Sequence, residues 1–247
     1  MHSSFNIGNI AVPAYGLMVT LGIMVVNVIA SIVARKKNIR QSLVLLLELI
    51  VGTCAVIGAK LLSIFFAVLS KGNILGLSWE IYRTSGYAFY GALILGLASF
   101  RVATLFLKVD MEQIASSFGF LAPLLHAFWK MGCLLGGCCY GIPYNGPFAI
   151  VFPKGTEAPA EINLFPVQIV EMLVVLIIAA VLYLYGRKQK KHVIEVYLIF
   201  YGLARSVIEL FRFHNYISIF WCNEIISLGL VIGSISSLAV KYRRENS

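Results

Sequence analysis

The fold class is decided by residues 166–185, PVQIVEMLVVLIIAAVLYLY, together with GRKQKK at 186–191 directly after them. An apolar run of about 20 residues is long enough to cross the hydrocarbon core of a bilayer as a helix. The basic segment that follows is typical of a cytoplasmic flank, because Lys and Arg collect on that side of the membrane. The stretch therefore predicts a transmembrane helix that runs toward the cytoplasm.

The composition extends this interpretation to the whole chain. The 247 residues are 60% hydrophobic and 13% charged, and the mean hydropathy is +0.87. A soluble domain is about a quarter charged and at most about half apolar, so a soluble globular fold is excluded. About seven spans of about 20 residues would use nearly all of the apolar residues. Apolar runs occur at 10–33, 42–69, 86–107, 113–137, 166–185, 193–213 and 218–240.

The net charge of +9 follows from topology. Twelve of the 20 basic residues share one side of the membrane if seven spans alternate: Arg35, Lys36, Lys37, Arg40, Lys108, Arg187, Lys188, Lys190, Lys191, Lys241, Arg243 and Arg244. This asymmetry predicts an outer N-terminus and a cytoplasmic C-terminus, and no nucleic-acid partner is needed to explain the charge. We expect an all-α integral membrane protein of about seven transmembrane helices. Residues 1–247 would form a single polytopic domain, with extracytoplasmic loops at about 70–85 and 138–165.

Charged residues inside the apolar runs are candidates for function. In YGLARSVIELFRFHN, residues 201–215, Arg205, Glu209 and Arg212 lie at i, i+4 and i+7 and share one face of a predicted helix. A charge at the bilayer centre costs several kcal/mol unless it faces a cavity or a partner. Glu209 can neutralise only one of the two guanidinium groups, so the face stays positive and suits a phosphate group. The alternative is a row of ion pairs that only holds helices together.

The second polar segment is HAFWKMGCLLGGCCYGIPYNGPFAIVFP, residues 126–153. His126 and Lys130 share a helical face at i and i+4. Three cysteines follow: Cys133, Cys138 and Cys139. Their C-x4-C-C spacing is not a recognised zinc pattern and a tetrahedral site needs a fourth ligand, so no metal site is predicted. We expect the cysteines to pack as small buried side chains, with disulfide chemistry on the outer face as the alternative.

Six segments resemble motifs of the prolipoprotein diacylglyceryl transferase family, a seven-span membrane enzyme family, and occur in the same order. They are Ala14-Tyr15-Gly16-Leu17-Met18, Phe89-Tyr90-Gly91-Ala92, the signature loop at 126–153, Phe165-Pro166-Val167-Gln168 with Glu171, the Arg205, Glu209 and Arg212 stripe, and Asn223-Glu224-Ile225-Ile226-Ser227. The resemblance covers most of the chain.

The resemblance implies a reaction and its partners. The family transfers a diacylglyceryl group from phosphatidylglycerol to the thiol of a lipobox cysteine in a prolipoprotein signal peptide, at the bacterial plasma membrane. Expected partners are therefore phosphatidylglycerol, the prolipoprotein and membrane lipids, with no nucleic acid and no cofactor. The implied catalytic residues are Tyr90, His126, Arg205 and Glu209, and the implied substrate-binding residues are Tyr15, Lys130, Gly141, Gln168, Arg212 and Glu224.

Four positions depart from the family pattern. Tyr90 replaces a histidine, and tyrosine is a poor base at neutral pH because its reference pKa is about 10; His126 is the candidate replacement for that imidazole. Lys130 replaces an arginine and lacks its bidentate fork. Cys133 and Cys138 replace an asparagine and an acidic residue. Two alternatives therefore stay open, namely the same fold with another acceptor or with cysteine chemistry, and a phospholipid-binding membrane protein without turnover.

Overall fold

The computed structural model describes residues 4–7, 10–71, 79–188, 191–214 and 217–246, and in these residues the chain is mainly helical. The helices are α1 (Ala14–Lys36), α2 (Gln41–Lys71), α3 (Trp79–Thr84), α4 (Phe89–Phe106), α5 (Met111–Phe118), α6 (Leu121–Gly136), α7 (Val167–Arg187), α8 (Val193–Glu209) and α9 (Ile217–Asn246). Two antiparallel pairs add the strands β1 (Ser4–Ile7), β2 (Ile10–Pro13), β3 (Ile150–Val151) and β4 (Asn163–Leu164).

Helix length and apolarity are those of an all-α membrane protein with several candidate spans. Five described helices, α1, α2, α4, α7 and α9, are long and apolar enough to cross a bilayer, and α5 with α6 makes a sixth if this bent pair is one span. Helix α8 has 17 residues, about 25 Å at 1.5 Å per residue, which is less than the hydrocarbon core of about 30 Å. The seventh span and the orientation of the termini stay predictions.

The apolar run at 113–137 forms two helices rather than one. Helix α5 ends at Phe118 and α6 begins at Leu121, with a bend of 45° between them. Pro123 explains the break, because it has no N–H to donate to the carbonyl four residues earlier and its ring opposes a continuous helix. In the first turn of a new helix the missing N–H costs nothing.

The described chain divides into two compact units, one formed by Met1–Ala30 with Ala115–Ser247 and the other by Ser31–Ile114. We call them unit 1 and unit 2. In unit 2, α2 and α4 approach closely through Gly58 and Gly91: a Cβ on Gly58 would lie 2.3 Å from the Gly91 carbonyl oxygen. Small residues permit such approach between membrane helices. Lys60 is also used within unit 2, where its Nζ donates to the Ser85 carbonyl.

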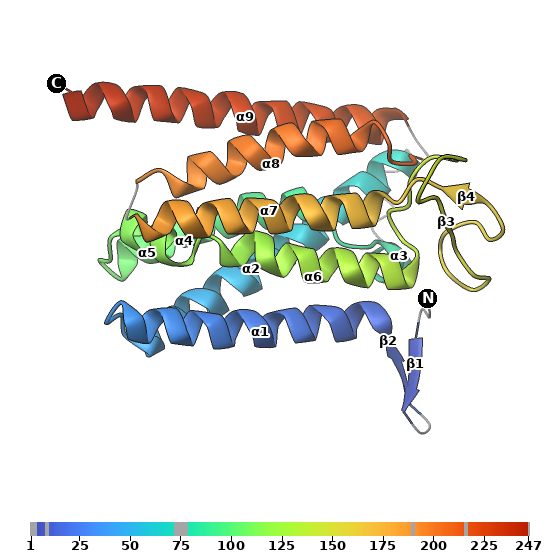
Figure 1. The fold of residues 1–247 in the computed structure, drawn as a ribbon, viewed down its shortest axis with the longest axis horizontal. Coiled ribbons are helices and arrows are strands. Elements are labelled where there is room, and N and C mark those ends of the chain that lie inside the picture. The colour runs from blue at the N-terminus through green and yellow to red at the C-terminus, as the bar shows by residue number, and fades with distance from the viewer. Residues whose placement is uncertain (1–3, 8–9, 72–78, 189–190, 215–216, 247) are drawn as a thin grey trace. The chain divides into compact units, whose positions relative to one another are not determined.

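In unit 1 the helices α6, α7, α8 and α9 lie side by side in chain order (Figure 1). The loop that carries β3 and β4 lies at the end where α6 and α8 finish and α7 and α9 begin. Phe152, Ala158 and Leu164 form a small buried core in this loop. The segment expected at 138–165 is therefore a folded structure that can hold side chains against the helix ends.

Candidate functional site

A buried carboxylate on α7 connects three helices of unit 1. The Glu171 side chain is only 1% exposed, and its Oε2 lies 2.8 Å from Lys130 Nζ of α6 and 2.9 Å from Arg205 Nη1 of α8. His126 Nε2, also on α6, lies 3.5 Å from Glu171 Oε1. A buried charge is tolerated only with good partners, so these contacts fix how α6, α7 and α8 face one another.

A second carboxylate, Glu209 at the end of α8, continues the network. Arg205 Nη2 contacts Glu209 Oε2, so one guanidinium joins both carboxylates. Arg212 Nη1 lies 4.0 Å from Oε2, and His214 Nε2 lies 3.3 Å from Oε1. Asn223 of α9 donates a hydrogen bond to Oε1. The polar network therefore runs from α6 through α7 and α8 to α9.

The charges of this network do not cancel. Three basic side chains, Lys130, Arg205 and Arg212, face the two carboxylates Glu171 and Glu209, which leaves one formal positive charge in excess. The positive character expected from the sequence is thus present, although Glu171 contributes a second carboxylate that the sequence argument did not include. Since Arg205 lies between both carboxylates, the excess is located at Arg212, whose ion pair is the longest of the arginine contacts.

Arg212 does not lie on the helical stripe that its spacing predicted. Helix α8 ends at Glu209, and Arg212 forms an isolated β-bridge with Gly141 of the loop. Ile142 N donates to the Phe211 carbonyl at 3.0 Å, and Phe213 N donates to the Tyr140 carbonyl at 3.1 Å. The prediction of one continuous helix was wrong because these loop hydrogen bonds replace the helical ones.

Gly141, predicted as a site residue from the resemblance, is required for this pairing. A Cβ at Gly141 would lie 2.4 Å from the Phe165 carbonyl oxygen and 3.0 Å from the Phe211 carbonyl oxygen. Any side chain would push the loop away from the segment that carries Arg212. Gly141 therefore acts through the backbone, by allowing two chain segments to approach.

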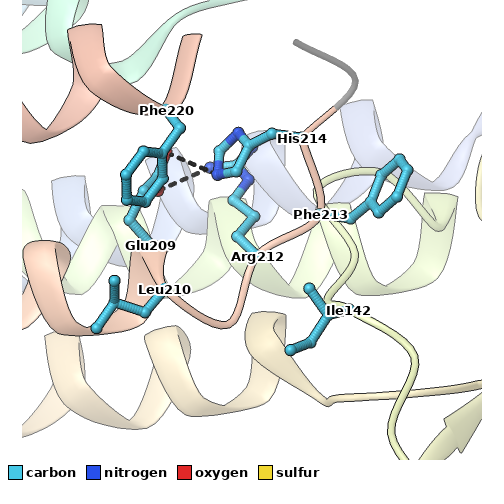
Figure 2. Close-up of a pocket in the computed structure, with 7 residues that line it drawn as sticks. All are labelled: Ile142, Glu209, Leu210, Arg212, Phe213, His214 and Phe220. Atoms are coloured by element: carbon cyan, nitrogen blue, oxygen red, sulfur yellow. Dashed lines mark ion pairs between the residues drawn. The ribbon is translucent and has the colours of Figure 1, made fainter. Parts of the chain in front are cut away.

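A cavity of about 420 Å³ opens beside this network. Its lining residues are Ile142, Glu209, Leu210, Arg212, Phe213, His214 and Phe220. Figure 2 shows Arg212 and His214 directed toward the Glu209 carboxylate, close to the Phe220 ring. The excess positive charge thus meets a cavity with mostly apolar walls, a combination that suits an anionic group attached to an apolar molecule.

His214 is a functional candidate that the sequence analysis did not single out. Its side chain is 13% exposed and lines the cavity. Burial lowers the pKa of His214 below its ordinary value of about 6.5, although the nearby Glu209 carboxylate acts in the opposite direction. The imidazole is therefore mainly neutral at pH 7 and can accept a proton.

The three cysteines of the loop lie together. The Sγ atoms of Cys133, Cys138 and Cys139 are all within 4.8 Å of one another, and each cysteine is a free thiol. Cys133 is buried, while Cys138 and Cys139 are partly buried. The expected packing role fits this burial, but three adjacent thiols also form a potential ligand set.

A family model described as prolipoprotein diacylglyceryl transferase matches residues 2–240. The chain belongs to this family. It is similar to the phosphatidylglycerol–prolipoprotein diacylglyceryl transferase of Clostridium tetani, at 28% identity over 215 residues that cover 84% of each protein. It is also similar to transferase 2 of that name from Clostridium perfringens, at 25% identity over 90% of this chain and 88% of the relative. The Finegoldia magna transferase is 24% identical over 98% of this chain and 96% of the relative.

In this member of the diacylglyceryl transferase family, two further predicted site residues, Gln168 and Tyr15, contact the loop and α6. Gln168, buried on α7, donates from Nε2 to the Cys138 carbonyl at 2.9 Å and so holds the loop. Tyr15, at the start of α1, packs edge-on against Trp129 with ring centroids 5.9 Å apart. Both residues contact neighbours of the charge network, which indicates a positioning role.

The two remaining predicted site residues, Glu224 and Tyr90, lie on α9 and α4. Glu224 is half-buried on α9, but its neighbour Asn223 makes the contact with Glu209. Tyr90 is buried at the start of α4, in unit 2, and its role stays a prediction.

The central position of Glu171 is not evident from the sequence. This residue was noted only as part of a family-like motif, whereas the structure makes it the common partner of Lys130 and Arg205. One signal was available, since a carboxylate in an otherwise apolar span requires a cationic partner. The sequence could not identify that partner, because the cations lie on two other helices.

We predict that Glu171→Gln destabilises the protein strongly. The change leaves the buried cations Lys130 and Arg205 without their shared carboxylate, and loss of one member of a buried ion pair costs about 3–5 kcal/mol. Thermal unfolding of the detergent-solubilised protein measures the effect. The matched control is Glu161→Gln, since Glu161 pairs with Lys154 on an exposed surface and such pairs contribute about 1 kcal/mol or less. Equal effects of the two changes would contradict the central role of Glu171.

Proposed function

We propose that this chain transfers a diacylglyceryl group from phosphatidylglycerol to the thiol of a prolipoprotein's lipobox cysteine, at the bacterial plasma membrane. The observation that carries the proposal is the excess positive charge at Arg212 on the wall of a largely apolar cavity. Phosphatidylglycerol has one negatively charged phosphate between two glycerol groups, so its charge matches the excess. The relatives named for this reaction support the same conclusion. We also propose an outer N-terminus and a cytoplasmic C-terminus, based on the distribution of Lys and Arg.

Arg212 would bind the phosphate and stabilise its departure. In the reaction the C–O bond between the diacylglyceryl carbon and the phosphate breaks, a C–S bond forms, and glycerol phosphate leaves with increased negative charge. Preorganised donors aimed at developing charge are the main source of such stabilisation. Arg205 is engaged by Glu171 and Glu209, so its proposed role is to hold Glu209 in position rather than to bind the phosphate.

His214 is the proposed acceptor of the thiol proton. A thiol becomes a good nucleophile only as its thiolate, so a base must lie near the acceptor. His126, the candidate from the sequence, is 2% exposed at its side chain and faces Glu171, whereas His214 lines the cavity. We therefore assign the proton transfer to His214, with Glu209 orienting its imidazole.

The direct test combines the purified protein with phosphatidylglycerol and a lipobox peptide. We expect a peptide heavier by one diacylglyceryl group, joined through a thioether, with release of glycerol phosphate; mass spectrometry detects both products. Binding of phosphatidylglycerol without product would instead support a non-catalytic lipid-binding protein. Transfer to a different thiol or hydroxyl compound, with none to the peptide, would support an altered acceptor.

We predict that Arg212→Ala reduces kcat/KM by about 10- to 150-fold, since a hydrogen bond to a charged group contributes about 1.5–3 kcal/mol. Arg212→Lys should recover part of the activity, because the charge remains but the bidentate fork is lost. The control is Arg187→Ala, an exposed position at the end of α7, which should leave turnover unchanged. The thioether product, measured over time, gives these rates. Full activity of folded Arg212→Ala protein would refute the phosphate assignment.

We predict that kcat/KM rises with pH and that the midpoint of this rise lies below pH 6.5. Burial lowers the pKa of His214, so its neutral, proton-accepting form is already in the majority at a pH where an ordinary histidine is half protonated. His214→Gln should remove this rising limb and slow the reaction by about 10²–10⁴-fold, the usual contribution of a general base. His192→Gln, at the start of α8, is the control. A rising limb that persists in His214→Gln would exclude His214 as the base.

A further inference from the structure

The cluster of Cys133, Cys138 and Cys139 has the geometry of a three-ligand metal site. Their Sγ atoms lie within 4.8 Å of one another. A zinc ion bonded at about 2.3 Å to three sulfurs at tetrahedral angles holds those sulfurs about 3.8 Å apart. Adjustments of about 1 Å, within the reach of side-chain rotation, would therefore close the three thiols around one ion.

The backbone around the cysteines is already shaped for this arrangement. Helix α6 ends at Gly136, and both Gly137 (φ 76°) and Cys139 (φ 58°) adopt left-handed conformations. These two residues turn the chain back toward the last turn of α6, where Cys133 lies. The hydrogen bond from Gln168 to the Cys138 carbonyl fixes the turn from α7. The carboxyl end of a helix also carries partial negative charge, which favours a cation.

The ligand set indicates zinc with one open coordination position. Thiolates select soft or borderline ions such as zinc and copper(I). Catalytic zinc sites have three protein ligands and leave the fourth position to water or substrate. The C-x4-C-C spacing lacks the fourth protein ligand of a structural zinc site, but a catalytic site needs only three.

The loop that holds the cysteine cluster pairs with residues that line the proposed substrate cavity. Cys139 directly precedes Tyr140, whose carbonyl accepts the Phe213 hydrogen bond, and Gly141 pairs with Arg212. Phe213 and Arg212 both line the cavity.

We propose that Cys133, Cys138 and Cys139 bind a zinc ion whose fourth ligand is the acceptor cysteine thiolate. A thiol that coordinates zinc loses its proton, which His214 accepts. The zinc-bound sulfur then attacks the diacylglyceryl carbon: the S–C bond forms, the C–O bond to phosphate breaks, and its electron pair leaves with glycerol phosphate. The neutral thioether is a weak ligand and dissociates. No oxidation or reduction occurs, and the step rests on the function proposed above.

Metal content tests the site without any assay of activity. Full-length protein purified in detergent with zinc supplied should contain about one zinc per chain, and Cys133→Ser, Cys138→Ser and Cys139→Ser should each lower that content. The isolated residues Cys54 and Cys222 are the controls, and their serine variants should keep the wild-type content. Wild-type protein without zinc, or a triple serine variant with the wild-type content, would overturn the proposal.

Zinc X-ray absorption tests the open position. We expect three sulfurs at about 2.3 Å and one lighter atom, with a fourth sulfur after a lipobox peptide is added and no change with a peptide in which serine replaces the cysteine. A fourth sulfur already present without peptide would overturn the proposal. So would preferential binding of copper(I) in a three-coordinate site that gains no sulfur from the peptide.

Activity after chelation separates this proposal from the proposed function. Loss of transfer in zinc-free, folded protein and its return on addition of zinc would support the zinc step. Full transfer in zinc-free protein would overturn the zinc step and leave the function intact. Zinc bound with the peptide sulfur as fourth ligand, but with no product under any condition, would support the site and refute the transferase function.

Discussion

The contact of Glu171 with Lys130 and Arg205 is the constraint on which unit 1 depends. A carboxylate with 1% of its side chain exposed, near the start of an apolar helix, is tolerated only beside cations. Those cations come from α6 and α8, so both helices must present one particular face to α7. Apolar packing alone would permit other rotations of these helices, because lipid and apolar side chains are nearly equivalent as neighbours.

The same network decides where charge is available for chemistry. Arg205 lies between two carboxylates, so its charge is already balanced inside the protein. Arg212 follows the end of α8 and is held by backbone pairing with the loop at Gly141, which places it on the cavity wall. A residue just beyond a helix end can combine a fixed backbone with partial exposure of its side chain. The side chain of Arg212 is 19% exposed. The structural ion pairs and the charge at the cavity wall are thus adjacent but distinct.

Three of the four positions that depart from the family pattern lie close together. Lys130, Cys133 and Cys138 are on or directly after α6, and Gln168 holds the loop that contains Cys138. We propose a common explanation for their proximity: one way of handling the acceptor proton is replaced by another beside the proposed phosphate-binding residues. The proposed phosphate side of the site, by contrast, retains Arg205, Glu209 and Arg212.

The sequence by itself determined the class of the protein, most of its helices, the family resemblance and several pairs of functional residues. Apolar runs and basic flanks are local properties, and a spacing of four residues places His126 with Lys130, or Arg205 with Glu209, on one helical face. It could not determine which faces meet, because Glu171 and Arg205 are 34 residues apart and helical periodicity carries no information about neighbouring helices. Only the tertiary structure showed that Glu171 joins the cations, that α8 stops at Glu209, that His214 enters the cavity and that three thiols meet. In each case the contact joins two segments of the chain, and the residue pattern of one segment does not depend on that of the other.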